Sequence, residues 1–484
     1  MPEGLGPVEA ERRADHGSAA RWWPLVVVGL VQLMVVLDAT IVNIALPSAQ
    51  ADLALSEGER HWVITAYVLL FGGLLLMGGR VADRFGTRRV LLLGLTGFAA
   101  ASALGGAAPG GDMLFAARGL QGVSAAFVAP AALSLLSRTY VEPGERGIAF
   151  GVYGALSSGG AAVGLLAGGV LTEALDWRWC LYVNIPIAVV AFVGALATIP
   201  RISPSAGVRL DLPGAALSCG GLTAIVFGFT QAEARGWADP LVLGLLGAGG
   251  VLMVAFGLVQ SRARQPLLPL RVLTDRARGG AVLAVAFSQV ALFGFFLFIT
   301  FYMQAVLGYS PLLAGLAFLP LTVATAVGAG VLGARALPRR GPRPLIVSGL
   351  IIAAVGMACL TVLEPGTELV YPAFLLPGQL AIGLGLGLVM MPAMSTATAG
   401  VPAADTGAAS ATVNAAQQVG GALGTALLNT IAASVTATAL AAGGDRSTAE
   451  VSGYTAGVAA GAAILAVTAL AAFLMLPRHY GRVR

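Results

Sequence analysis

The sequence contains no lysine, because all 28 of its basic residues are arginine. A Walker A phosphate loop depends on its lysine, so the chain cannot use an ATPase of that type, and its energy must come from an ion gradient or a separate subunit. Charge is scarce in general: charged residues make up 11% of the 484 residues, against about 25% in soluble domains. Most of the surface must therefore face something other than water.

Cysteine and histidine are equally scarce, at three residues each. The cysteines are Cys180, Cys219 and Cys359. None has metal-ligand spacing, so we interpret them as packing residues and expect neither a metal site nor another cofactor. The histidines are His16, His61 and His479. Their positions in tails or at a helix end argue against an enzyme.

Apolar residues are abundant instead, at 57% of the chain, and the mean hydropathy is +0.86. A bilayer-spanning helix needs about 20 mainly apolar residues, and we find fourteen candidate runs. They cover residues 24–46, 62–79, 89–108, 112–137, 147–171, 178–199, 211–231, 240–260, 279–301, 311–334, 344–363, 371–397, 406–433 and 455–476. The sequence predicts an all-α integral membrane protein with 14 transmembrane helices.

Along the chain the runs are counted as six, then two, then six. The expected parts are an N-terminal tail (1–23), six runs (24–199), two runs with a linker (200–278), six further runs (279–476) and a C-terminal tail (477–484). The connections are too short for a soluble catalytic domain. Two Gly- and Arg-rich junctions, at 79–89 and 333–343, suggest the internal repeat of many secondary transporters. The first run is too long for a signal peptide, so we expect a retained helix.

Arginine placement predicts the orientation, because cytoplasmic loops collect arginine. With the N-terminus inside, 23 of the 28 arginines are cytoplasmic. The arginines left outside are Arg60, Arg178, Arg235 and Arg446. One helix more or fewer would mix the cytoplasmic arginines with the outside ones, so we expect both termini in the cytoplasm. This placement also explains the net charge of +5 without a nucleic-acid partner.

Two ionisable residues interrupt the apolar runs. Asp38 lies in the first run, about 20 Å from its cytoplasmic start at 1.5 Å per residue. A charge at such depth costs about 2.5–3.5 kcal/mol, which favours a role with a proton, an ion or a substrate. The alternative is a hydrated residue near the outer end. Arg118 shares a helix face with Gln121 three residues later; its alternative is an arginine that reaches the outer interface.

Other polar or glycine-rich positions have two interpretations each. Asp83 lies among arginines at a helix junction, where it forms either a gate contact with Arg84, Arg88 or a neighbouring helix end, or only a topological anchor. Three glycines spaced by four residues from Gly160 permit close helix packing. The thirteenth run has polar residues that either line a cavity or bond between helices. They are Thr412, Asn414, Gln417, Gln418 and Asn429.

These positions lie in blocks that resemble the drug:proton antiporters with fourteen helices, of the Emr and Qac multidrug type, in the major facilitator superfamily. The resemblance covers nearly the whole chain. The first-helix motif L-D-x-T-I-V-N-x-A-L-P is matched from Leu37 to Pro47. The loop motif G-x-L-A-D-R-x-G-R-[RK] is matched at Gly79, Asp83, Arg84, Gly86 and Arg88. The fourth-helix motif R-x-x-Q-G falls on Arg118, Gln121 and Gly122.

Further blocks are similar to the same family. They are Trp177–Trp179 with Asn184–Pro186, Tyr302 with Gln304, Gly308–Pro311, and Gln418–Gly424. The antiporter motif G-x-x-x-G-P-x-x-G-G is matched at Gly160, Gly164, Gly168 and Gly169. Leu165 occupies its proline place, so the glycine face is present and the proline kink is missing.

The resemblance implies two six-helix bundles with two extra helices between them, alternating access, and export driven by proton influx. By position, Asp38 would be the proton or cation site, and Arg118 with Gln121 would support coupling. Asp83, Arg84 and Arg88 would latch the cytoplasmic gate. The candidates for lining the cavity are Asn43, Tyr302, Gln304, Asn414 and Gln418.

The leading hypothesis is therefore proton-coupled export of small hydrophobic drugs or antibiotics, cations among them, from a bacterial cytoplasm. The chain is expected to be a monomer in the lipid bilayer, with the proton gradient as its only energy source. Apolar and aromatic walls are expected to bind the substrate. Uptake by proton symport and a non-transporting receptor or scaffold are the alternatives. The fifth-run glycines argue against symport, and the insertion cost of Asp38 and Arg118 argues against a scaffold.

Overall fold

The computed structural model describes residues 21–140, 142–200, 210–263, 266–268, 270, 274–364, 369–398 and 406–477. Across these residues the regular structure is helical, without a strand. Thirteen of the helical stretches are long and apolar enough to cross a membrane. An all-α membrane fold, as predicted, follows from the need to satisfy every backbone polar group inside the segment that crosses lipid.

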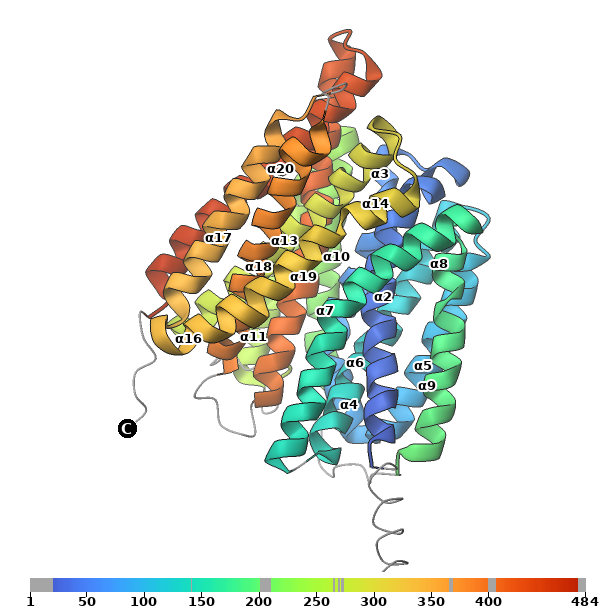
Figure 1. The fold of residues 1–484 in the computed structure, drawn as a ribbon, viewed down its shortest axis with the longest axis vertical. Helices are drawn as coiled ribbons and strands as arrows, with labels where there is room; N and C mark the ends of the chain where they lie inside the picture. The colour runs from blue at the N-terminus through green and yellow to red at the C-terminus, as the bar shows by residue number, and fades with distance from the viewer. Residues whose placement is uncertain are drawn as a thin grey trace, which may run out of the picture.

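The first group of helices packs around α2 (Trp23–Asp52). Its other members are α3 (Glu57–Arg60), α4 (Trp62–Phe85), α5 (Thr87–Gly106), α6 (Gly111–Thr139), α7 (Pro143–Ala174), α8 (Trp179–Tyr182) and α9 (Asn184–Thr198). Helix α2 lies against α6, α7 and α9, and α6 also lies against α4 and α5. The group occupies the right half of Figure 1.

The second group begins with α13 (Arg276–Phe301), which continues into the π-helical turn η1 (Tyr302–Val306). Its other members are α14 (Pro311–Ala317), α15 (Leu319–Ala326), η2 (Val327–Gly333), α16 (Ala334–Arg340), α17 (Pro342–Ala358), η3 (Cys359–Val362), η4 (Tyr371–Leu375), α18 (Leu376–Thr398), α19 (Thr406–Ala441) and α20 (Arg446–Met475). Helix α13 packs on α19 and α20, and α17 packs on α18 and α20.

Two helices lie between these groups in the chain, α10 (Leu212–Arg235) and α11 (Pro240–Arg262). They pack on each other, and α10 also contacts α4 of the first group and α19 of the second. Only 17% of the most apolar part of α11 is buried in the protein. A helix that is apolar on every side yet largely uncovered is suited to face lipid.

The two ends of the molecule differ. We call the end where α2 begins and α20 finishes the terminal side, and the opposite end the distal side. Helices α7 and α14 touch on the distal side. Figure 1 shows α7 diverging from α15 and α16 toward the terminal side. The groups therefore contact each other on the distal side through α7 and α14, while the ribbons of α7 and α16 move apart toward the terminal side; α4 and α19 also pack together between the groups.

The predicted runs agree with the observed helices closely, with three differences. The fifth run is a single 32-residue helix, α7, but the apolar stretch described within it, Gly159–Ala174, falls short of a span. The count of fourteen spans therefore stays a prediction. Residues 79–89, expected as a loop, instead continue α4 to Phe85. Only Gly86 separates α4 from α5, with a φ of 94° that favours glycine.

The expected polar connection 434–454 is also mostly helical. Helix α19 continues to Ala441 and α20 begins at Arg446. The hydroxyls of Ser434 and Thr438 donate to carbonyls one turn earlier, and Asp445 caps α20 by accepting from the Thr448 N–H. Polar residues that bond within their own helix do not need a loop. The result is a helical hairpin at the top of Figure 1.

Candidate functional site

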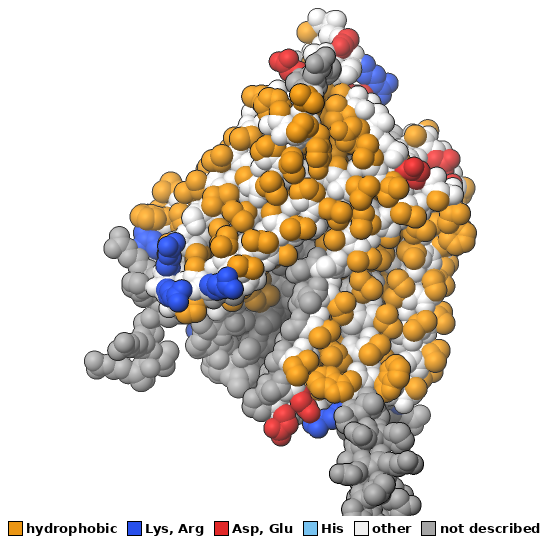
Figure 2. Space-filling model, viewed as in Figure 1, with side chains coloured by type: hydrophobic (Ala, Val, Ile, Leu, Met, Phe, Trp, Pro, Cys, Tyr) orange, Lys and Arg blue, Asp and Glu red, His pale blue; other side chains and the backbone are white. Residues whose placement is uncertain are grey.

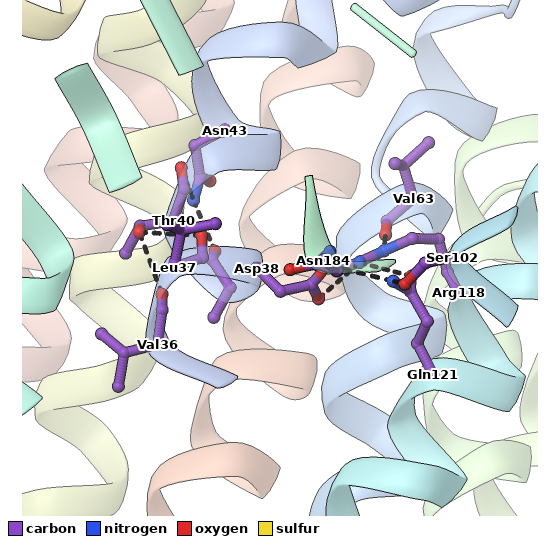
Figure 3. A network of polar contacts seen from close by, with 11 residues as sticks. Val36, Leu37, Asp38, Thr40, Asn43, Val63, Ser102, Arg118, Gln121 and Asn184 are labelled. Carbon is purple, nitrogen blue, oxygen red and sulfur yellow. Dashed lines mark hydrogen bonds and ion pairs between the residues drawn. The ribbon is translucent and has the colours of Figure 1, made fainter. Parts of the chain in front are cut away.

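A buried ion pair lies at the centre of the first group. Asp38 of α2 and Arg118 of α6 have 0% and 1% of their surface exposed. The Arg118 Nη1 donates to Asp38 Oδ2 at 2.7 Å. Two side-chain amides donate hydrogen bonds to the other carboxylate oxygen. Gln121 Nε2 donates to Asp38 Oδ1 at 3.0 Å, and Asn184 Nδ2 of α9 donates to the same oxygen at 2.8 Å. Figure 3 shows these side chains converging from three helices.

The arginine is satisfied on its other sides as well. Its Nε donates to the Val63 carbonyl at 2.8 Å, and Nη1 also donates to Gln121 Oε1 at 2.8 Å. Its guanidinium lies 4.5 Å from the ring centre of Tyr67. Gln121 is held in turn by Ser102, whose Oγ accepts from Nε2 at 2.8 Å. Both surface alternatives, a hydrated Asp38 and an Arg118 at the interface, are therefore wrong.

The R-x-x-Q-G motif has a local physical reason. Three residues along a helix bring Arg118 and Gln121 onto one face, so both reach the same carboxylate. Gly122 faces α4, where a Cβ would overlap the carbonyl oxygen of Tyr67. The glycine thus lets the α6 backbone approach α4 closely enough for Arg118 to reach the Val63 carbonyl.

This arrangement balances one buried negative charge with one buried positive charge. While Asp38 is ionised, the pair is neutral and both members are hydrogen-bonded. Protonating the carboxyl would leave Arg118 buried without a counterion, a situation that costs about 3–5 kcal/mol. Such a cost is relieved by moving Arg118 or the helix that bears it. A proton on Asp38 is therefore able to bias one conformation over another.

Three members of the network were not predicted as site residues. Asn184 lies in the N-x-P block that resembles the family, so the sequence marked this position but did not indicate that it binds Asp38. Ser102 and Tyr67 gave no signal, because one small hydroxyl or one ring in an apolar helix is ordinary. Asn184 Oδ1 and the Tyr67 hydroxyl are buried with no hydrogen-bond partner among the described residues. The network therefore retains capacity for a further donor or acceptor.

The predicted gate residues form contacts mainly within the first group. Asp83 pairs with Arg138 at the end of α6, at 2.8 Å, which is the neighbouring-helix alternative and not a contact with Arg84 or Arg88. Arg88 donates to the Leu196 carbonyl of α9 at 2.8 Å. Both members of the Asp83 pair are 38% exposed. These contacts join the terminal ends of neighbouring helices around the Gly79–Gly86 corner, and their role in gating stays a prediction.

The glycines of α7 face two different partners. A Cβ on Gly160 would meet Val36, one on Gly164 would overlap Thr40, and one on Gly168 would lie 2.8 Å from the Ile41 carbonyl oxygen, so these three pack on α2. Gly169 faces the second group, where its Cβ would lie 2.6 Å from the Leu312 Cα.

The backbones of α7 and α14 thus touch across the two groups. A Cβ on Gly315 would lie 2.6 Å from the carbonyl oxygen of Leu165, the residue in the motif's proline place. Glu173 Oε2 accepts from the Leu312 N–H at 3.1 Å. Small residues and a carboxylate at a helix start therefore close the distal side.

Arg60, one of the arginines predicted to lie outside, makes a second distal contact. It is 2% exposed and lies between the groups, 4.1 Å from the ring centre of Phe301 and 5.6 Å from that of Tyr454. Its Nε donates to Asn429 Oδ1 at 3.4 Å, and Asn429 Nδ2 donates to the Glu57 carbonyl at 3.2 Å. The arginine is held by aromatic faces and an amide.

The candidate cavity residues lie in varied surroundings. Tyr302 donates to the Glu364 carbonyl at 3.1 Å, and Gln304 donates to the Ile44 carbonyl at 2.9 Å, joining η1 to α2. Asn43 donates to the Ala39 carbonyl of its own helix at 3.0 Å. Asn414 and Gln418 are half-buried on α19. A cavity-lining role for these five residues stays a prediction.

Comparison with known proteins identifies the class. Residues 28–425 match the sequence profile of the Major Facilitator Superfamily. The chain belongs to this superfamily, as the resemblance predicted, and is therefore a multi-pass membrane transporter and not an enzyme.

Named relatives are similar over most of their length. The chain is 58% identical to the puromycin resistance protein pur8 of Streptomyces alboniger, over 98% of this chain and 95% of the relative. It is 38% identical to the cephamycin export protein CmcT of Amycolatopsis lactamdurans, over 85% of each. It is 33% identical to the tetracenomycin C resistance and export protein of Streptomyces glaucescens, over 86% of this chain and 77% of the relative.

Solved structures share the fold at low sequence identity. A peptide transporter POT in complex with sulfate has a TM-score of 0.66 at 18% identity, covering 93% of this chain and 94% of that one. A bacterial homologue of the human lysosomal transporter Spinster, in an inward-facing and unoccupied conformation, has a TM-score of 0.65 at 18% identity. The match covers 96% of this chain and 99% of that one. These likenesses support the major facilitator fold.

Proposed function

We propose that the protein exports a small hydrophobic antibiotic from a bacterial cytoplasm in exchange for protons, by alternating access. The observation that carries the proposal is the buried Asp38–Arg118 pair, a titratable group whose protonation unbalances a buried charge. The similarity to antibiotic resistance and export proteins supports the substrate class. The 58% identity to a puromycin resistance protein makes puromycin the first substrate to test.

The proposed cycle uses the two sides of the molecule in turn. With the distal contacts of α7 and α14 closed, the terminal side admits substrate from the cytoplasm. Separation of α7 from α14 then opens the distal side, where substrate leaves and Asp38 takes up a proton. Return to the first state releases that proton to the cytoplasm and restores the pair with Arg118.

The proposed orientation places the terminal side in the cytoplasm, as the 23-to-4 distribution of arginine predicts. In this orientation the chain works as a monomer in the cytoplasmic membrane, with protons as its energy source and without a cofactor. A cysteine at Ser56, an exposed residue on the distal side, should react with an impermeant maleimide in intact cells. Protection of that cysteine until permeabilisation would reverse the orientation.

Everted membrane vesicles test the transport directly. Acidifying the vesicle lumen should drive radiolabelled puromycin into the lumen, and nigericin should abolish this uptake by collapsing the pH gradient. Uptake that follows an alkaline lumen would indicate proton symport instead. Vesicles that show no gradient-dependent movement of puromycin or a panel of antibiotics would favour a receptor or scaffold.

A further inference from the structure

An apolar groove runs along the outer surface of the second group, between α17 and α20. Its volume is about 650 Å³, and its walls extend from Val347 to Ala358 on α17 and from Phe473 back to Ala462 on α20. At about 1.5 Å per residue the α17 wall is about 16 Å long. This length is close to half of the ~30 Å hydrocarbon core of a bilayer, so the groove spans about one leaflet.

Positive charge lies at the terminal mouth of this groove. The Arg343 guanidinium is 3.8 Å from the ring centre of Phe473, a wall residue. Because Arg343 precedes Val347 by four residues, it lies on the same face of α17 as the groove wall. Three more arginines lie just before it in α16, at Arg335, Arg339 and Arg340. Figure 2 shows basic side chains gathered at this end of the apolar surface.

Among the described residues, no acidic side chain balances this charge. Residues 334–344 contain no acid, and in the described parts of the chain no carboxylate pairs with these four arginines. Helix α17 begins at Pro342, after Gly341, which provides no side-chain cap, so the positive end of the helix dipole lies at the same mouth. A strip of apolar surface ending in unpaired cations complements an anionic amphiphile.

We propose that an anionic phospholipid binds at this groove, with its phosphate at Arg343 and one acyl chain between α17 and α20. A neighbouring groove provides a contrast within the same molecule. It lies between α13 and α20, with a volume of about 280 Å³. Arg276, four residues before the wall residue Gly280, already donates to the Leu474 carbonyl at 2.8 Å. The second groove is suited to an acyl chain without a preference for the headgroup.

The site does not depend on proton coupling or on the identity of the exported molecule. Only the leaflet depends on the proposed orientation, which would make it the cytoplasmic leaflet, where Arg343 adds to the attraction of anionic headgroups.

Native mass spectrometry of the full chain in detergent tests the site. The chain is titrated with palmitoyl-oleoyl phosphatidylglycerol and, separately, with phosphatidylcholine carrying the same acyl chains. We expect one phosphatidylglycerol to bind about fivefold more tightly than phosphatidylcholine, the effect of one arginine near an anionic lipid. Arg343→Gln should remove this preference. Arg262→Gln removes an exposed arginine at the end of α11, also on the terminal side of the molecule, and should leave the preference for phosphatidylglycerol unchanged.

A second variant separates the groove from the charge. Ala466 lines the groove and is exposed, so Ala466→Phe fills it without entering the core and should weaken both lipids. Unchanged phosphatidylglycerol affinity in either Arg343→Gln or Ala466→Phe would overturn the proposal. So would displacement of the lipid by inorganic phosphate alone, which would show a headgroup site without the groove. A dimer mass that Ala466→Phe abolishes would assign the groove to a second copy of the chain and also overturn it.

Discussion

The two groups of helices share a fold but differ in where they place charge. The first group buries Asp38 and Arg118 in one hydrogen-bonded network with Gln121 and Asn184. In the second group, the buried polar side chains of the described residues are all neutral, for example Ser288, Gln379 and Asn429. Among the described residues, buried charge thus lies in the first group.

The groups also differ in helix regularity. The π-helical turns η1, η2 and η4 all belong to the second group, and the described part of the first group has none. A π-helical turn shifts the register of the chain and is frequent at functional sites. The amide of Gln379, close after η4, is buried with both polar atoms unpartnered among the described residues. In the proposed mechanism, the first group would hold the proton site firmly while the second adapts its shape to the exported molecule.

The largest expected effect comes from removing the charge of the first group. Asp38→Asn should abolish proton-driven export, because the variant carboxamide does not titrate. It should also lower stability by about 3–5 kcal/mol, since Arg118 is left buried without a counterion. Thermal unfolding and substrate/proton exchange in proteoliposomes measure the two effects separately.

A double variant separates coupling from folding. Asp38→Asn combined with Arg118→Gln removes both charges, so we expect stability to recover while export stays absent. Exchange at the wild-type rate in either variant would show that Asp38 is not the proton site.

The next largest effect is expected at the contact between the groups. Gly169→Ala places a methyl group against Leu312 of α14, and overpacking of this kind costs about 1–3 kcal/mol. The distally open state should gain about tenfold in population. A cysteine at Ile44, buried in the parent, should then react faster with an external maleimide in a cysteine-free background.

Gly159→Ala is the matched control on the same helix, because a Cβ there meets nothing within 4 Å. Equal labelling of the two glycine variants would show that the contact between α7 and α14 does not close the distal side.

A smaller effect is expected for the second group. The Phe296 ring is half-buried, 5.2 Å from Phe318 and 5.8 Å from Phe295. Phe296→Ala should change the relative export of different antibiotics by about threefold, as expected for one aromatic pair, while proton coupling is kept. Inhibitory concentrations across an antibiotic panel measure this shift. Phe287→Ala, at an exposed ring of α13, serves as control, and identical profiles for both variants would contradict the prediction.

The smallest effect is expected at Asp83. Its partner Arg138 is as exposed as Asp83 itself, and exposed pairs contribute little. Asp83→Asn should therefore slow export by less than about fivefold, and Arg138→Gln should do the same. Initial transport rates check this. Complete loss of export in Asp83→Asn with normal protein levels would instead support the predicted gate.

Hydropathy and arginine spacing predicted most of the helices, because a lipid-facing segment must be apolar along its whole length. The motif around Arg118 predicted the centre of the site, since a buried charge is costly and therefore informative. The partners Asn184 and Ser102 were harder to predict, because their proximity to Asp38 depends on how α5 and α9 pack. The burial of Arg60 was equally hard to predict, because the aromatic rings that cover it belong to the other group.

The helical hairpin of α19 and α20 has a practical consequence for imaging. At 36 residues, α19 is about 54 Å long, well beyond the ~30 Å that lipid requires. Its last turns and the start of α20 form a stiff protrusion on a 48.7 kDa particle that is otherwise buried in a micelle. An antibody fragment raised against this protrusion, with the exposed Arg446 in its epitope, would give electron microscopy an alignment marker outside the micelle.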